Sequence, residues 1–244
     1  MSKSVSEVAF VTYSTHSFKN SKMLLCNEAH QFGFRKFLIG SPENLSDDFL
    51  KKHGAFIEQS QRGAGYWLWK PLVVKETLKL LKDGDFLLYA DSGCAINPEG
   101  KNRFSEWLDM ADKHGSLSFQ MNHLPEKDWT KMSLAKFMNA THAHMESGQI
   151  NATVFLIKKN QKNCEMIEEW FDVCSQHWTI DDTPSDIPNS SSFKDHRHDQ
   201  SVFSLLRKKY NSFAIEDETY PAKNHDWSDP SVKFVPVLAA RRRI

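Results

Sequence analysis

The sequence of 244 residues contains 31 lysine and arginine residues against 31 aspartate and glutamate residues, so its formal net charge is +0. A chain without excess positive charge has no overall field that draws it to nucleic acid or anionic lipid, which excludes a dedicated nucleic-acid-binding domain. The length suffices for one sizeable α/β core, and we interpret residues 1–244 as a single domain.

The cysteines and the apolar segments indicate a water-soluble protein of the cytoplasm. The four cysteines are scattered and form no Cys-x-x-Cys pair, so reduced thiols are the simplest interpretation. The amino terminus has no apolar signal core, and no stretch approaches the roughly 20 apolar residues that span a bilayer. We expect at most peripheral contact with the inner face of a membrane.

The first third of the chain begins with a β-α-β pattern. Residues 8–13 and 37–40 are short apolar runs typical of buried strands, and residues 21–32 between them have helical spacing. A further helix is expected over 47–52. This order predicts an α/β fold with a central, mostly parallel sheet flanked by helices.

Small polar side chains stand at the end of the first strand. They are Thr12, Tyr13 and Ser14, each with a hydroxyl group. Hydroxyl groups at this point can bond a base edge or a ribose without filling its space. The alternative is ordinary turn and N-cap chemistry for the next helix.

The chain is organised around the glycine-rich aromatic stretch 62–71, which leads into a helix expected over 72–82. Gly63 permits a backbone conformation that other residues avoid. Tyr66 and Trp67 offer flat ring faces to a sugar or a base. The sequence therefore predicts a ligand-binding loop ahead of this helix.

Two basic side chains border this stretch. Arg62 and Lys70 carry charges suited to a phosphate group, or they are solvated side chains at the start of a helix. A cation at a helix start is disfavoured by the helix dipole unless an anion lies nearby, which favours a functional role for Lys70.

The next strand, expected over 86–89, ends on an acidic turn. Asp91 follows it directly, with Ser92 beside it, at the position where open sheets place ligand chemistry. A carboxylate here can contact a ribose or hold Mg²⁺ or Mn²⁺. Since Asp, Ser and Gly all favour turns, an Asp-Ser-Gly turn without further function is the alternative.

The second half alternates less regularly. Helices are expected over 103–113, 134–139, 164–178 and 200–209, with strands over 116–120 and 150–157 and no long strand within 121–149. The polar, proline-broken segment 179–194 is a tolerated surface insertion or, alternatively, a lid or an acceptor loop. The terminal arginines 241–243 are interpreted as a solvated chain end or as a weak contact with an anionic membrane.

Four motifs in order resemble nucleotide-sugar glycosyltransferases of the GT-A fold. They are GYWLWKP at 65–71, LLYADSG at 87–93, NATVFLIKK at 151–159 and HDQSVFS at 198–204. The resemblance implies that residues 1–115 bind the nucleotide, that 116–244 form the acceptor and catalytic part, and that Asn151 and His198 belong to the substrate site. It also implies a nucleotide-sugar donor, UDP-linked, and a glycan or lipid-linked acceptor.

Asp199 and Gln200 correspond in this resemblance to a pair that faces the reacting sugar. Asp199 is thus expected to be a catalytic base or to stabilise an oxocarbenium-like transition state, and the pair favours retention of configuration. The alternative for Asp199 is an N-cap of the helix that follows. The two roles are compatible.

The metal expectation rests on the same resemblance. GT-A enzymes with an Asp-x-Asp strand end hold Mn²⁺ or Mg²⁺ there, whereas this chain has Gly93 at the second position, which leaves Asp91 and a late histidine, His225, as the expected ligands. The His-x-His pairs at 142–144 and 196–198 suggest a zinc site only as a minor alternative.

Two other functions compete with sugar transfer. A sugar-nucleotidyltransferase would share the sheet, but its first loop is normally a glycine-rich phosphate loop, and residues 12–19 contain no glycine. A non-catalytic nucleotide- or glycan-binding module would explain the missing second carboxylate.

Overall fold

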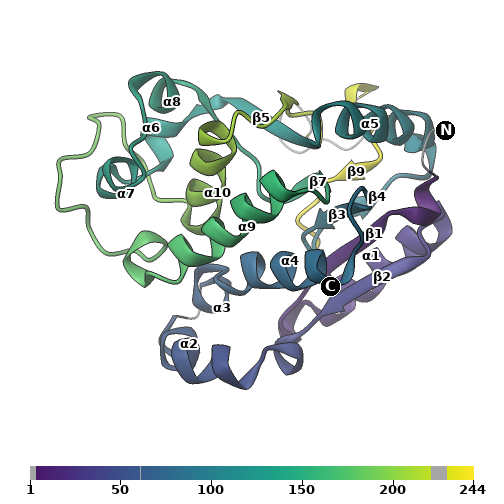
Figure 1. Ribbon diagram of the computed structural model, residues 1–244, viewed down its shortest axis with the longest axis horizontal. Coiled ribbons are helices and arrows are strands. Elements are labelled where there is room, and N and C mark those ends of the chain that lie inside the picture. The colour runs from purple at the N-terminus through teal and green to yellow at the C-terminus, as the bar shows by residue number, and fades with distance from the viewer. Residues whose placement is uncertain (1–3, 61, 221–229) are drawn as a thin grey trace.

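The computed structural model describes residues 4–60, 62–220 and 230–244 (Figure 1). The helices are α1 (Lys19–Phe32), α2 (Asp47–Gln59), α3 (Gly63–Tyr66), α4 (Trp69–Leu80), α5 (Lys101–His114), α6 (Glu126–Trp129), α7 (Met132–Phe137), α8 (His142–Glu146), α9 (Gln161–Cys174) and α10 (His198–Lys209). The strands are β1 (Ala9–Tyr13), β2 (Lys36–Gly40), β3 (Phe86–Ala90), β4 (Ala95–Ile96), β5 (Ser116–Pro125), β6 (Gly148–Ile150), β7 (Val154–Lys158), β8 (Ala214–Glu216) and β9 (Val237–Leu238).

Within the described residues the main sheet is seven-stranded, with the order β2-β1-β3-β7-β5-β6 and with β8 paired to β5. β1 runs parallel to β2 and β3, and β5 runs parallel to β8. β7 is antiparallel to β3 and β5, and β6 is antiparallel to β5. Most strands therefore point the same way, and the predicted mostly parallel α/β sheet is confirmed.

Alternate residues of the central strands enter two cores, because successive side chains of a strand point to opposite faces. Val11 and Leu87 belong to the core under α4, α9 and α10, whereas Phe10 and Leu88 belong to the core with α1 and α5. Helices thus cover both faces of the sheet (Figure 1). Burial on both faces explains why these strands are continuous apolar runs in the sequence.

Two strand predictions were wrong in their limits. β5 continues to Pro125 inside the segment expected to lack a long strand, because Gln120 and Met121 pair with β6. The run 150–157 is not one strand. β6 ends at Ile150 and β7 begins at Val154, since the buried Asn151 forms a turn between them, with its Oδ1 accepting from Thr153 N at 2.5 Å.

Several helices also differ from their predicted limits. α2 continues to Gln59, beyond the expected end at residue 52, and α9 ends at Cys174 rather than at residue 178. α4 begins three residues early, at Trp69, so that Lys70 lies inside the helix. This last shift matters because it fixes the direction in which Lys70 points.

The terminal arginines are not all solvated, contrary to the sequence interpretation. Arg242 forms an ion pair with Glu28 of α1, 2.6 Å between Nη1 and Oε1. Ile244 N donates to Ser21 Oγ at 3.1 Å. The end of the chain is therefore held against α1, and Figure 1 shows the C-terminus inside the outline of the molecule.

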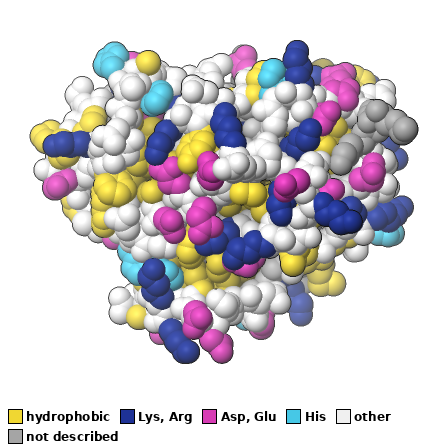
Figure 2. Space-filling model, in the orientation of Figure 1, with side chains coloured by type: hydrophobic (Ala, Val, Ile, Leu, Met, Phe, Trp, Pro, Cys, Tyr) yellow, Lys and Arg dark blue, Asp and Glu magenta, His cyan; other side chains and the backbone are white. Residues whose placement is uncertain are grey.

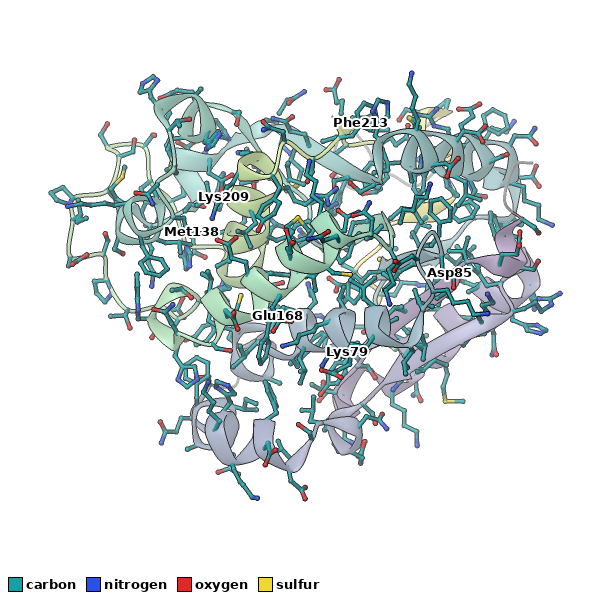
Figure 3. All side chains as sticks on the ribbon, in the orientation of Figure 1. Lys79, Asp85, Met138, Glu168, Lys209 and Phe213 are labelled. Carbon is teal, nitrogen blue, oxygen red and sulfur yellow. The ribbon has the colours of Figure 1, made fainter. Side chains whose placement is uncertain are left out.

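Charges of both signs are mixed on the molecular surface that Figure 2 shows, as the zero net charge leads one to expect. Figure 3 shows part of this arrangement, with Lys79 on α4 and Glu168 on α9, two helices that lie side by side. Lys75 of α4 forms an ion pair with Glu168. Within the described ranges, none of the helices is both long and apolar enough to cross a membrane.

Candidate functional site

The candidate site lies at one edge of the sheet, where β1 and β3 end and β7 begins. The antiparallel register places Ala90 opposite Val154, so the residues after β3 meet those before β7. Asp91 N donates to Thr153 O at 2.9 Å across this junction. It is the edge at which open α/β sheets bind their ligands.

A buried ammonium group joins two carboxylates at this edge. Lys70 Nζ lies 3.2 Å from Asp91 Oδ1 and 3.1 Å from Asp199 Oδ2. It also donates to Ala152 O at 3.3 Å, and the Tyr89 hydroxyl donates to Asp91 Oδ1 at 2.7 Å. The Asp91 side chain is 29% exposed and that of Asp199 only 5%, so Asp91 is the acid of the pair that a ligand can reach.

Burial and mutual attraction set the charges of Lys70 and Asp199. Burial alone would lower the pKa of Lys70, but Asp199 and Asp91 raise it above its usual value, so the ammonium stays charged. Burial raises the pKa of Asp199 to about 6, although Lys70 acts in the opposite direction. Lys70 is thus not a solvated side chain, and the two carboxylates are the anions that a cation at this helix start requires.

The first turn of α10 brings Asp199 and Gln200 to this edge. No side chain caps the helix, so the predicted N-cap role of Asp199 is wrong: its carboxylate faces Lys70 instead. Gln200 Oε1 accepts from Ala152 N at 3.4 Å, and its Nε2 donates to Gln149 Oε1 at 2.9 Å. Gln200 therefore holds the connection between β6 and β7.

Asn151 performs a similar structural task in that connection. Its side chain is fully buried and its Nδ2 donates to Asp217 Oδ2 and to Thr219 Oγ1, each at 3.2 Å. With Oδ1 bonded to Thr153 N, the whole amide is engaged. Asn151 thus shapes the turn that carries Thr153 against Asp91.

The glycine-rich stretch forms a left-handed turn ahead of α4. The φ angles are 61° at Gly63, 49° at Ala64, 85° at Gly65, 51° at Tyr66 and 62° at Trp67. This conformation costs residues other than glycine roughly 1–2 kcal/mol each. A Cβ at Gly63 would lie 2.5 Å from the Trp67 ring, so the predicted need for glycine here has a steric basis. Strain of this kind concentrates at ligand sites.

The left-handed turn sets Tyr66 and Trp67 against His198. Their ring centroids lie 4.8 Å and 5.6 Å from that of His198. His198 Nδ1 donates to Ile180 O at 2.6 Å, and its buried Nε2 has no hydrogen-bond partner within the described residues. The stretch 65–71 and the motif 198–204 are thus brought together, each contributing rings to one cluster.

The end of β1 carries the predicted nucleotide contacts. Tyr13 stacks on Trp69 with ring centroids 4.0 Å apart and is 2% exposed, so its ring is covered. The hydroxyls of Thr12 and Ser14 are buried and have no partner among the described residues. Ser92, at the end of β3, is also buried. Ser14 borders a hollow of about 380 Å³ between the start of α1 and the end of β2.

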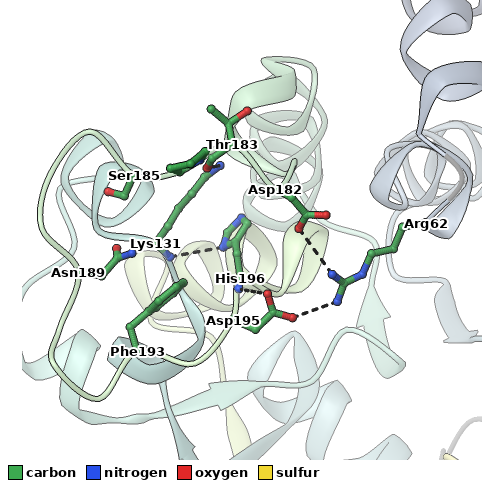
Figure 4. A pocket seen from close by; sticks show the side chains of 10 residues that line it. Arg62, Lys131, Asp182, Thr183, Ser185, Asn189, Phe193, Asp195 and His196 are labelled. Atoms are coloured by element: carbon green, nitrogen blue, oxygen red, sulfur yellow. Dashed lines mark hydrogen bonds and ion pairs between the residues drawn. The ribbon is translucent and has the colours of Figure 1, made fainter.

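A second hollow, of about 260 Å³, lies beneath the segment 182–196 (Figure 4). Arg62 is held there between two carboxylates, 3.5 Å from Asp182 Oδ1 and 3.1 Å from Asp195 Oδ2. Tyr66 also donates to Asp182, at 2.9 Å. Arg62 remains half-exposed, and it links the left-handed turn to this segment.

Buried polar groups form the floor of this second hollow. Lys131 Nζ lies 3.2 Å from Asp181 Oδ1 and bonds two backbone carbonyls. His196 Nδ1 accepts from Lys131 N at 3.4 Å, and Nε2 donates to Thr179 O at 2.8 Å. Burial lowers the pKa of His196 to about 3, so the ring is neutral.

A divalent cation fits the described part of the first site poorly. Asp91 Oδ1 already accepts from Tyr89 and faces the Lys70 ammonium, which would repel a cation. No group of three or more His, Cys, Asp or Glu suited to a metal occurs within residues 4–60, 62–220 and 230–244. The other predicted ligand, His225, lies outside the described residues. The Lys70 ammonium thus occupies the place beside Asp91 that a metal ion would have to take.

Sequence reasoning missed three residues that complete these sites. Tyr89 stands two residues before Asp91, and this spacing places the two on the same side of an extended chain, a signal that was available. Asp182 and Asp195 meet Arg62 only through the folded path of a segment without periodic pattern, so nothing in the sequence pointed to them.

The sequence matches no protein-family model and no curated protein. Among solved structures, a glycosyltransferase involved in the glycosylation of the major capsid of PBCV-1 is similar with a TM-score of 0.51 and 13% identity, over 95% of this chain and 91% of that one. Mouse xyloside xylosyltransferase 1 in its apo form gives 0.48 and 9% over 94% and 96%. The WbbM bifunctional glycosyltransferase in its apo structure gives 0.49 and 13% over 98% and 45%. The first of these likenesses shows the fold over nearly the whole chain.

Proposed function

We propose that this chain, which has a GT-A-like glycosyltransferase fold, transfers a sugar from a nucleoside-diphosphate donor to a hydroxyl group of a glycan or lipid-linked acceptor. The observation that carries the proposal is the Asp91–Lys70–Asp199 array at the carboxyl end of β3. We further propose a UDP-linked donor and retention of configuration.

Sugar transfer requires a fixed donor, a stabilised leaving diphosphate and exclusion of water. Asp91 is the accessible acid of the array, and its carboxylate can accept hydrogen bonds from hydroxyl groups of the nucleotide-sugar. Lys70 holds the Asp91 carboxylate in place, since Nζ is itself held by Asp199 and Ala152 O. A fully buried cation between two acids has little freedom, which favours a preorganised site.

The catalytic roles of Asp199 and Gln200 remain predictions. Burial of Asp199 and the engagement of the Gln200 amide favour a positioning role for both, Asp199 through Lys70 and Gln200 through the turn after β6. An ionised Asp199 would also stabilise positive charge that develops on the sugar ring.

The two hollows suit the two substrates. The hydroxyls of Thr12 and Ser14 have no partner among the described residues, and that of Ser14, which borders the hollow at the end of β1, can bond a nucleoside. The hollow at Arg62, with its hydroxyl, amide and carboxylate groups, suits the hydroxyl groups of a glycan acceptor. Tyr66, which donates to Asp182 of this hollow, packs with Trp67 against His198, and these rings can offer edges and faces to a sugar.

The metal requirement is a separate question. The resemblance implies Mn²⁺ or Mg²⁺, whereas the surroundings of Asp91 favour a donor site in which side chains supply the positive charge. Binding measured in Mn²⁺ and in EDTA separates these possibilities.

The test is thermal stabilisation by a panel of nucleoside diphosphates and their sugars, each with Mn²⁺ and with EDTA. A ligand at 100 times its Kd adds about 2.7 kcal/mol to the free energy of unfolding, a readily measured melting shift. We expect one nucleotide to stabilise the wild type and to stabilise Asp91→Asn much less. If no nucleotide in the panel shifts the melting temperature of the wild type, the proposal is wrong.

A further inference from the structure

The C-terminal segment 239–244 docks on the turn that follows β3. Arg242 N donates to Gly93 O at 2.9 Å. A Cβ at Gly93 would lie 3.2 Å from Arg242 O and 3.3 Å from Arg241 Cα, tighter than ordinary contact. Gly93, which stands where an Asp-x-Asp motif has its second acid, is therefore the position on which the chain end packs.

Arg242 anchors this segment. Its guanidinium forms a double ion pair with Glu28, 2.6 Å from Oε1 and 2.8 Å from Oε2, and its Nε donates to Cys94 O at 3.1 Å. Ser21 Oγ donates to Arg242 O at 3.2 Å. The Arg242 side chain is thus fully occupied, and its neighbour Arg241 is fixed beside the turn.

Arg241 is left exposed at the site. Its backbone is left-handed, with φ 51°, and its guanidinium carbon lies 5.3 Å from the centre of the Tyr220 ring. Tyr220 in turn hydrogen-bonds with Thr153, the residue whose carbonyl accepts from Asp91 N. Arg241 therefore lies over the junction of β3 and β7.

A second arginine approaches from α10. Arg197 precedes the helix, and its guanidinium carbon lies 4.1 Å from the centre of the Trp129 ring. Burial lowers the pKa of Arg197, and the positive charge of Arg241 also lowers it, whereas Tyr220 and Asp195 raise it. Within the described residues, both rest on aromatic rings and form no ion pair with a carboxylate.

Two neighbouring cations favour the binding of an anion between them. Lys70 does not need such an anion, because Asp91 and Asp199 already neutralise it. Arg197 and Arg241 have no carboxylate at ion-pair distance among the described residues, and Arg241 hydrogen-bonds only with Tyr220, so both can bind an anionic ligand. The bidentate geometry of guanidinium groups also matches phosphate oxygens.

We propose that Arg241, positioned by the docked C-terminal segment, binds the diphosphate of the donor together with Arg197. The proposal rests on the proposed function. It assigns neutralisation of the donor's diphosphate to a residue of the C-terminal segment. The proposal also explains why a glycine stands at position 93. An acidic side chain there would displace the C-terminal segment and would place a negative charge beside the phosphates.

The test measures Kd in EDTA for three probes: inorganic pyrophosphate, UDP and uridine. The variants are Arg241→Gln and, as a control of equal charge change, Arg35→Gln. Arg35 is suitable because it lies just before β2, at the opposite edge of the sheet, and bonds only His30 O and Phe34 O in the described structure. Unliganded melting temperatures verify that both variants fold.

We expect Arg241→Gln to weaken pyrophosphate and UDP about tenfold or more, with uridine unchanged, because the lost bonds are charge-assisted. Arg35→Gln should bind all probes like the wild type. The inference is overturned if Arg241→Gln binds pyrophosphate and UDP as tightly as the wild type, or if the wild type binds neither. A wild type that binds UDP through Arg241 but releases sugar from no donor would instead refute the proposed function alone.

Gly93→Asp provides an independent variant. If Gly93 served only as a degraded metal position, restoring the acid would strengthen UDP binding when Mn²⁺ is added. We expect weaker UDP binding in both EDTA and Mn²⁺, because the new Cβ meets the backbone of Arg241 and Arg242. Tighter binding of UDP with Mn²⁺ would overturn the account of this turn.

Discussion

The Lys70 ammonium is the least replaceable single group of the candidate site. A buried ion pair seldom adds much net stability, because desolvation offsets the attraction, but removal of one partner leaves an uncompensated buried charge. Here two carboxylates depend on one cation. Such an arrangement is better explained by the need to hold the Asp91 side chain in a fixed position than by stability.

Lys70→Met should lower the free energy of unfolding by roughly 3–5 kcal/mol, since Asp199 then lies buried without a cation. Urea unfolding at pH 7 measures this. Adding Asp199→Asn to the variant removes one unpaired charge and should restore part of the loss. A Lys70→Met protein as stable as the wild type would show that the array is not buried as described.

The pKa of Asp199 predicts an acid limb in activity. Because burial raises this pKa from 3.8 to about 6, the folded protein holds a proton between these values that the unfolded chain releases. The stability contributed by this carboxyl group is therefore greatest below pH 3.8 and is lost as the pH rises to 6. If the ionised form is needed, kcat should fall as the pH drops below about 6. A profile that stays flat down to pH 4.5 would contradict an ionised Asp199 in the reaction.

At the scale of elements, the left-handed turn Gly63–Trp67 is what couples α4 to α10. It turns Tyr66 and Trp67 onto His198 and directs Arg62 to Asp182 and Asp195. The turn stores strain at Ala64, Tyr66 and Trp67, so its geometry must be maintained by these contacts.

Ala64 and Gly65 allow a matched test of this turn. Ala64→Gly should be neutral or stabilise by up to about 1 kcal/mol, because relief of the left-handed strain outweighs the extra freedom of glycine in the unfolded chain. Gly65→Ala should destabilise by more than about 1 kcal/mol, since φ is 85° and the new Cβ meets Ile57 Cγ1 at 2.7 Å. Equal effects of the two changes on thermal unfolding would mean that the turn is not left-handed in solution.

The elements with strong periodicity were predictable, and the connections were not. The strands 8–13 and 86–89 are buried on both faces, so a local apolar run suffices to identify them. The break at Asn151 was not predictable, because it depends on Asp217 and Thr219, which are more than sixty residues away. The docking of Arg242 on Glu28 depends likewise on a distant partner.

The same limit applies to the site. Asp91 was identifiable because a strand end is a local feature, and Lys70 because a cation at a helix start is unfavourable without an anion. That the anions are Asp91 and Asp199 required the fold. From the sequence alone, Asp199 could equally cap its helix or pair with Lys70. Both roles require an aspartate at the start of the helix, so the residue type does not distinguish them.

At the scale of the whole molecule, a buried neutral histidine makes the free energy of unfolding depend on pH. His196 is fixed as a neutral ring by Lys131 N and Thr179 O, and its pKa is lowered from 6.5 to about 3. Below pH 6.5 the unfolded chain takes up a proton at this residue that the folded protein does not accept. The stability from His196 is therefore complete above pH 6.5 and is lost as the pH falls towards 3.

The melting temperature of the wild type should accordingly drop between pH 7.5 and pH 5, and His196→Asn should show a smaller drop. Asparagine keeps a donor and an acceptor near the same partners but does not titrate. Scanning calorimetry at both values measures the difference. Identical drops in the two proteins would mean that His196 does not titrate differently in the folded and unfolded states.

The most direct test of the central claim is the release of nucleoside diphosphate from a panel of nucleoside-diphosphate sugars, by the wild type and by Asp91→Asn, in Mn²⁺ and in EDTA. Asp91→Asn is a fair comparison when its melting temperature stays close to that of the wild type. Our account predicts turnover of one donor class by the wild type and a loss of about 100-fold or more in the variant, because a donor contact preorganised by Lys70 is removed. No turnover of any donor, or equal turnover by both proteins, would contradict it.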